Sequence, residues 1–128
     1  MPRIAVQTSS APTPVGSYSQ GARRGALLQV AGQGGTDPAT GELVPGGVAE
    51  QTTQTLRNID AILRSEGSSL ADAVMLRVYL AHADDFPAMD AAYGAFLGHP
   101  FPARTTVVVG LLSGMLVEID ALAVLPDR

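Results

Sequence analysis

The chain contains no cysteine and no lysine. Without thiols it cannot form a disulfide, a cysteine nucleophile or a cysteine-ligated zinc or iron-sulfur centre. Its eight basic residues are all arginine, they are scattered, and twelve acidic residues give a formal net charge of -4. A general affinity for phosphate backbones needs clustered positive charge, so we expect no nucleic-acid partner.

Long apolar runs are also missing, and the first residues, MPRIAVQTSSAPTPVG, lack the charged start and apolar core of a secretory signal. We therefore expect a cytoplasmic protein without a membrane partner. The only histidines, His82 and His99, do not have the spacing of a metal site, and we predict no metal. His99 follows a predicted helix end, which favours a capping or surface role.

Hydrophobic residues make up 46% of the chain, and the mean hydropathy is +0.21. This is rich for a small monomer, which must cover its surface with polar groups. Burial of a sheet face between copies in a homo-oligomer would accommodate the excess. The length of 128 residues fits one domain, 1–128, with a core that needs no metal or disulfide.

Apolar periodicity predicts two helices and four strands in an α+β fold, with both helices on one face of a mixed sheet. The other face needs cover, which neighbouring copies would provide. Residues 36–47 read as a long turn with a short extended piece. The predicted helices are 48–66, ended by Gly67, and the segment after Asp84 or Asp85, ended by Gly98; the predicted strands are 25–33, 74–80, 103–109 and 115–124.

The last two predicted strands carry two charged residues, Arg104 and Glu118. A guanidinium loses its hydration at a high cost unless a partner accepts its hydrogen bonds. One interpretation is structural: Arg104 pairs with Glu118 or with Asp120, or it reaches water at the strand start. The other is functional: the planar fork of the arginine captures a small carboxylate while the glutamate handles water or protons.

Four segments of the chain carry a recognisable pattern: APTPVGSYSQG, AGQGGTDPATGELVPGGVAEQTTQTLRNIDAIL, FPAMDAAYGAF and PARTTVVVGLLSGMLVEIDALAV. The most specific parts are PAR and the strand VEIDALA. Together the segments resemble the reactive intermediate deaminase family, the RidA/YjgF-like proteins, and the similarity runs over about residues 11–124.

The resemblance implies a homotrimer with a chorismate-mutase-like fold and clefts between subunits. It also implies hydrolysis of reactive enamines and imines derived from amino acids, such as 2-aminoacrylate and 2-iminopropionate, to 2-keto acids and ammonia without a cofactor. By the same resemblance, Arg104 binds the substrate carboxylate and Glu118 positions the attacking water. Tyr18 lines the cleft, and Gly32 lies in a loop that approaches the substrate.

The chain departs from the family pattern at three further positions of the implied substrate site. Ala31 stands where a serine is frequent, Thr106 where a cysteine is frequent, and Asp90 where an asparagine is frequent. The loop LLSG, 111–114, lacks a common Leu-Pro and is shorter. These differences bear on the preferred substrate and on the shape of the cleft rim.

Two other functions stay open at this point. The same cleft could hold a small carboxylate without turnover, or the protein could cleave RNA or inhibit translation, as the family resemblance also allows. The acidic composition weighs against the RNA function. The aromatic residues Tyr93 and Phe96 fall on the apolar stripe of the second predicted helix, which is typical of core residues.

Overall fold

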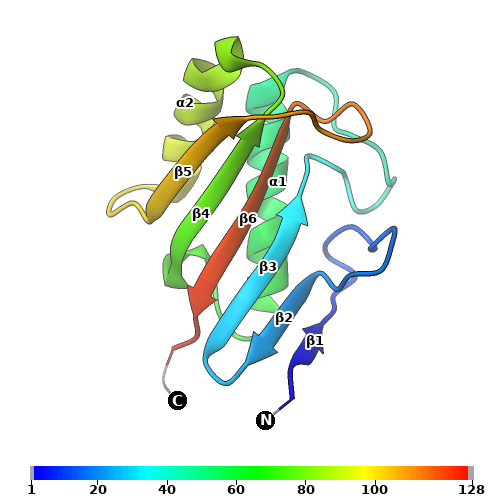
Figure 1. Cartoon of the computed structure of the whole chain (residues 1–128), viewed down its shortest axis with the longest axis vertical. Coiled ribbons are helices and arrows are strands. Elements are labelled where there is room, and N and C mark those ends of the chain that lie inside the picture. The colour runs from blue at the N-terminus through cyan, green and yellow to red at the C-terminus, as the bar shows by residue number, and fades with distance from the viewer. Residues whose placement is uncertain (1, 127–128) are drawn as a thin grey trace.

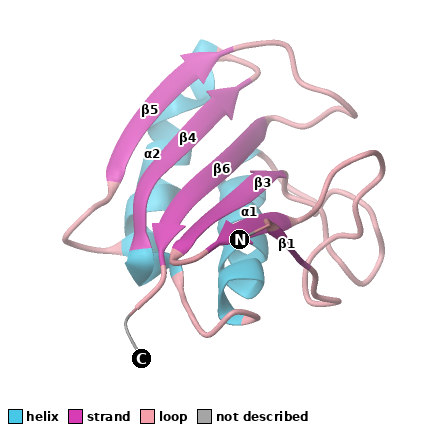
Figure 2. Cartoon of the chain, turned by 60° about the horizontal axis from the view of Figure 1, so that its bottom comes forward, coloured by secondary structure: helices cyan, strands magenta, loops and turns pink. Residues whose placement is uncertain are grey.

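A six-stranded mixed sheet, covered on one face by two helices, makes up the fold (Figures 1 and 2). The computed structural model describes residues 2–126. The strand order is β1-β2-β3-β6-β4-β5, and every neighbouring pair is antiparallel except β4 with β5. The strands are β1 (Ile4–Val6), β2 (Gly21–Arg24), β3 (Leu27–Gln33), β4 (Ala73–Leu80), β5 (Ala103–Val108) and β6 (Val117–Val124), and the α-helices are α1 (Val48–Arg64) and α2 (Phe86–Leu97).

The predicted α+β fold is confirmed, and each predicted helix and strand is present with ends shifted by a few residues. Gly67 and Gly98 follow the two helices with positive φ angles of 75° and 70°, which glycine adopts more readily than any other residue. Asp85 occupies the N-cap position of α2, but its side chain makes no capping hydrogen bond. Within residues 2–126, no helix is long and apolar enough to cross a membrane.

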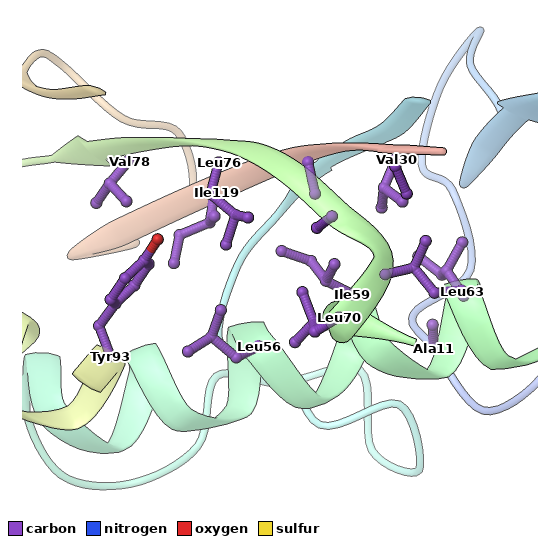
Figure 3. Packing of buried hydrophobic residues seen from close by; sticks show 14 of the residues in the cluster. Ala11, Val30, Leu56, Ile59, Leu63, Leu70, Leu76, Val78, Tyr93 and Ile119 are labelled. Atoms are coloured by element: carbon purple, nitrogen blue, oxygen red, sulfur yellow. The ribbon is translucent and has the colours of Figure 1, made fainter. Parts of the chain in front are cut away.

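The helix α1 provides one wall of the core. Its apolar residues recur at three- and four-residue steps, so that they form one face that packs under β3 and β6. Figure 3 shows Leu56, Ile59 and Leu63 of this helix pointing at Val30 and Ile119 of the sheet. All five of these side chains are fully buried. Tyr93 of α2 lies at one end of the same cluster (Figure 3).

Alternation along β4 and β6 gives the sheet two chemically different faces. Val78 pairs with Ile119, and both are buried against the helices. Their chain neighbours point the other way, because successive side chains of a strand alternate. Tyr79 therefore pairs with Glu118 on the side without helices, and Arg77 lies there too. We call the two sides the helix face and the open face.

The segment after β3 is tied to α1 and to the start of β6. The buried Asn58 donates hydrogen bonds to the carbonyl oxygens of Gly34 and Thr36, at 3.1 and 2.8 Å. Gln51 accepts one from the backbone N–H of Leu116 at 2.9 Å. The short extended piece predicted between 36 and 47 is the bridge of Thr36 with Leu43. These contacts hold the end of β3 beside the start of β6.

Candidate active site in two halves

The first half of the site is built around Arg104 at the outer edge of the sheet. Arg104 pairs with Leu76 in the parallel ladder of β5 and β4, so it projects from the helix face toward α2. Its Nη1 atom lies 2.7 Å from Asp90 Oδ1. Its Cζ atom lies 4.7 Å from the ring centroid of Tyr93 and 5.5 Å from that of Phe86. An anion and two aromatic rings thus fix the guanidinium, whose side chain stays 22% exposed.

The structural interpretation in which Arg104 pairs with Glu118 or with Asp120 of the same chain is wrong. The side chain pairs with Asp90 of α2 instead, because it points to the helix face while Glu118 and Asp120 lie on the open face. Asp120 has its own partners there: the Nε of Arg77 at 2.9 Å and the hydroxyl of Tyr79 at 3.0 Å. The carboxylates of β6 therefore do not neutralise Arg104.

Two hydroxyl groups lie near this arginine without a hydrogen-bond partner in the described part of the chain. Thr106 follows Arg104 on the same side of β5, and its Oγ1 atom is buried and unpaired. The hydroxyl of Tyr93, which points toward the sheet in Figure 3, is also buried and unpaired. Burial raises the pKa of this tyrosine, an effect that the charge of Arg104 opposes. Tyr93 is a core residue as predicted, but it also contacts the guanidinium, which the sequence did not reveal.

The second half of the site is built around Glu118 on the open face. The side chain lies directly over Gly32, where an added Cβ would approach Glu118 Oε2 to 2.6 Å and Cδ to 2.9 Å. Only a glycine leaves room for the carboxylate in this position. Burial raises the pKa of Glu118, and the neighbouring charge of Asp120 raises it further. The carboxylate is thus tuned toward holding a proton more readily than a free glutamate.

A hollow of about 590 Å³ lies on the same side of the sheet, beside the N-terminal segment. Tyr18 and Ala31, both predicted site residues, line it together with Arg3 and Gln29. Tyr18 is 49% exposed, and its hydroxyl accepts a hydrogen bond from the backbone N–H of Val15 at 3.3 Å. Sequence reasoning missed Arg3 and Gln29. Alternation could have placed Gln29 beside Ala31, whereas nothing in the sequence indicated that Arg3 lies here.

The structure therefore divides the predicted site residues into two groups. Arg104, Asp90 and Thr106 lie together beside β5, with the arginine on the helix face. Glu118 and Gly32 lie on the open face, and Tyr18 and Ala31 line the hollow there. Because β4 separates β5 from β6, and Arg104 and Glu118 project from opposite faces, one copy of the chain does not bring these two side chains into one cleft.

Comparison with known proteins identifies the class to which these features belong. A family model described as endoribonuclease L-PSP matches residues 8–125, and the chain belongs to this family, the RidA/YjgF family. The identification confirms the resemblance seen in the sequence.

Individual relatives match over almost their whole length. A RutC family protein of Pyrococcus horikoshii is 44% identical over 91% of this chain and 93% of its own. A protein of Capra hircus named 2-iminobutanoate/2-iminopropanoate deaminase is 41% identical over 95% of this chain and 90% of its own. The crystal structure of RidA from the Antarctic bacterium Psychrobacter superimposes with a TM-score of 0.91 at 38% identity, covering 95% of this chain and 99% of that one.

Substitution of Gly32 by alanine tests the close approach of Glu118. We expect Gly32→Ala to fold but to displace the carboxylate, because its Cβ would overlap Oε2 and Cδ. Carbon-13 NMR of the glutamate carboxyl groups, with and without the substitution, should show a changed titration for Glu118. Gly94→Ala is the matched control, because a Cβ there meets only Phe101 Cζ at 3.8 Å. An unchanged Glu118 titration in Gly32→Ala would contradict the packing.

The raised pKa of Glu118 also predicts how stability depends on pH. The folded chain holds this proton more tightly than the unfolded chain does, so ionisation of Glu118 destabilises the fold. The penalty is absent below the ordinary pKa of 4.5 and complete above the raised folded value. Relative to Glu118→Gln, the wild type should therefore lose stability as the pH rises from 4.5 through the raised pKa of Glu118 in the folded chain.

Urea unfolding of both proteins across this range measures the difference. Glu42→Gln, which removes one charge at an exposed position, is the control. The stability of the wild type relative to Glu118→Gln could instead stay constant or increase with rising pH. That result would show that the surroundings of Glu118 do not disfavour its charged form.

Proposed function

We propose that the protein is a deaminase that hydrolyses 2-imino acids and their enamine tautomers to 2-keto acids and ammonia. The observation that carries the proposal is the fixed guanidinium of Arg104, 22% exposed and held by Asp90, Tyr93 and Phe86. Such a group is a preorganised carboxylate anchor. Relatives about 40% identical carry the name 2-iminobutanoate/2-iminopropanoate deaminase, which supports this substrate class.

We further propose that the working site lies between copies in a homotrimer. Arg104 and Glu118 face opposite sides of the sheet in one chain, so a cleft that uses both needs the arginine of one copy and the glutamate of another. Apolar side chains exposed at the end of β5 support a contact between copies there, with Val107, Val108 and Val109 at 40%, 53% and 38% exposure. A closed ring of identical contacts is the usual arrangement for such an oligomer.

The chemistry needs few protein groups. The carboxylate of the substrate binds the N–H groups of Arg104 that Asp90 leaves available, which fixes the neighbouring C=N carbon. This carbon is electrophilic, and more so when its nitrogen is protonated. A water molecule held by Glu118 adds its oxygen to the carbon, the π pair moves to nitrogen, and the glutamate accepts the proton of the water.

Collapse of the resulting carbinolamine completes the reaction. Glu118 returns its proton to the nitrogen, the C–N bond breaks and ammonia leaves. The hydroxyl oxygen forms the new carbonyl of the keto acid as its proton passes to the carboxylate of Glu118. The raised pKa of this glutamate suits a group that both accepts and returns a proton. Neither step consumes an oxidant or a cofactor.

The family description names a nuclease, but the charge of the chain favours the small-molecule reaction. The net charge is -4, and within residues 2–126 four arginines contact a carboxylate of the same chain. Binding of an RNA backbone would require these arginines to exchange partners or the acidic surface to be screened. A single anchored carboxylate requires only Arg104.

Replacement of Arg104 tests the proposal. Arg104→Ala should lower kcat/KM for 2-iminobutanoate by about 100-fold or more, because the charge-assisted bidentate contact with the substrate is lost. Arg104→Lys should retain a fraction of the activity, since it keeps the charge without the fork. The assay follows ammonia release from the imine generated in situ by an amino acid oxidase.

The exposed Arg57 on α1 provides the matched control, and Arg57→Ala should leave turnover unchanged. Circular dichroism and size-exclusion chromatography of each variant check the fold and the oligomer. Full activity in Arg104→Ala would overturn the assignment. Binding of 2-oxobutanoate without turnover of any imine by the wild type would show a carboxylate-binding protein instead.

A further inference from the structure

We propose that Asp90 is a specificity-determining residue that makes the site select monocarboxylic imino acids and reject those with a second carboxylate. The inference rests on the proposed function, because it concerns the substrate bound at Arg104. It starts from one contact: the carboxylate of Asp90 already occupies one corner of the guanidinium, with Oδ1 at 2.7 Å from Nη1.

The contact leaves part of the guanidinium free. Arginine has five N–H donors in a planar fork, and among residues 2–126 the side-chain hydrogen bonds of Arg104 go to Asp90 alone, through Nη1. The rings of Tyr93 and Phe86 are stacked near the guanidinium and accept no conventional hydrogen bond. A substrate carboxylate therefore binds the remaining N–H groups and shares one cation with Asp90.

Sharing changes the charge that an incoming substrate meets. An unpaired arginine attracts every anion, and a dianion more than a monoanion. The pair of Arg104 with Asp90 has no net charge, so the first carboxylate gains its hydrogen bonds with little long-range attraction. A second carboxylate on the substrate gains no hydrogen bond from this group and is repelled by Asp90, whose side chain is 51% exposed.

An asparagine at position 90 would keep the hydrogen bond with Arg104 and lose the discrimination against dicarboxylic substrates. Its amide oxygen accepts the same hydrogen bond from Nη1, so the guanidinium stays in place, but the compensating negative charge is gone. The unmatched arginine then attracts dicarboxylic substrates. Asp90→Asn is therefore a nearly isosteric test of charge alone, at a side chain exposed enough to tolerate the change.

The experiment compares two imino acids of similar size, one from norvaline and one from glutamate, each generated in situ by an amino acid oxidase. Wild type should prefer 2-iminopentanoate. In Asp90→Asn, kcat/KM for 2-iminoglutarate should rise about tenfold more than kcat/KM for 2-iminopentanoate, through KM and with kcat little changed. Added salt should reduce this difference, because the effect is electrostatic.

Asp84→Asn is the matched control: it removes the same charge from an exposed aspartate just before α2 that has no contact with Arg104, and it should leave the substrate ratio unchanged. If Asp90→Asn does not fold or assemble, Asp90→Ala removes the same charge and carries the same expectation for the ratio. Equal changes for both substrates, or the same change in ratio in Asp84→Asn, would overturn the role of Asp90.

Binding of the keto acid products separates this inference from the proposed function. In Asp90→Asn, the Kd for 2-oxoglutarate should fall about tenfold relative to the Kd for 2-oxopentanoate, whether or not any imine turns over. Turnover by the wild type with an unchanged Kd ratio would sink the proposal for Asp90 and leave the deaminase intact. Absence of turnover with the expected change in Kd ratio would sink the deaminase and leave Asp90 as the selector of bound carboxylates.

Discussion

The alternation of side chains across β4, β5 and β6 is the constraint on which the rest of the structure depends. It sends Leu76, Val78 and Ile119 into the core under the helices, and it decides where each charge can go. Arg104, in register with Leu76, must emerge beside α2, whereas Glu118, in register with Tyr79, must emerge on the open face. The core and the division of the site thus follow from the same strand register.

The two halves of the site differ in how they accommodate a partly buried ionisable side chain. The guanidinium of Arg104 is surrounded by a carboxylate and two aromatic rings, which hold it in one orientation although it is largely covered. Glu118 forms no salt bridge within residues 2–126, and burial raises its pKa. An anchor should keep its charge and a proton carrier should exchange it, so the two environments suit the roles that we propose.

The sequence was sufficient for the elements with a strong period and insufficient for contacts between elements. The apolar stripe of α1 and the β-rich runs of β4 and β6 predicted the layered α+β fold. Both β1 and β2 were missed. The three residues of β1 are too few to show alternation, and the sequence of β2, GARR, is too polar to show it. The partner of Arg104 was missed because docking of α2 against β5, which no local pattern encodes, brings Asp90 to it. The family resemblance named Asp90 as a site residue without indicating this contact.

The central claim is that Arg104 and Glu118 act together although they belong to different copies, and mixed oligomers test it most directly. Arg104→Ala and Glu118→Gln, each expected to be inactive alone, are unfolded together and refolded at equal amounts, and 2-iminobutanoate turnover is measured. A site shared between copies predicts recovery of about a quarter of the wild-type activity, because one site in four then has both residues intact. No recovery, from mixed oligomers of normal size and stability, would show that each site draws both residues from one chain and would contradict the account.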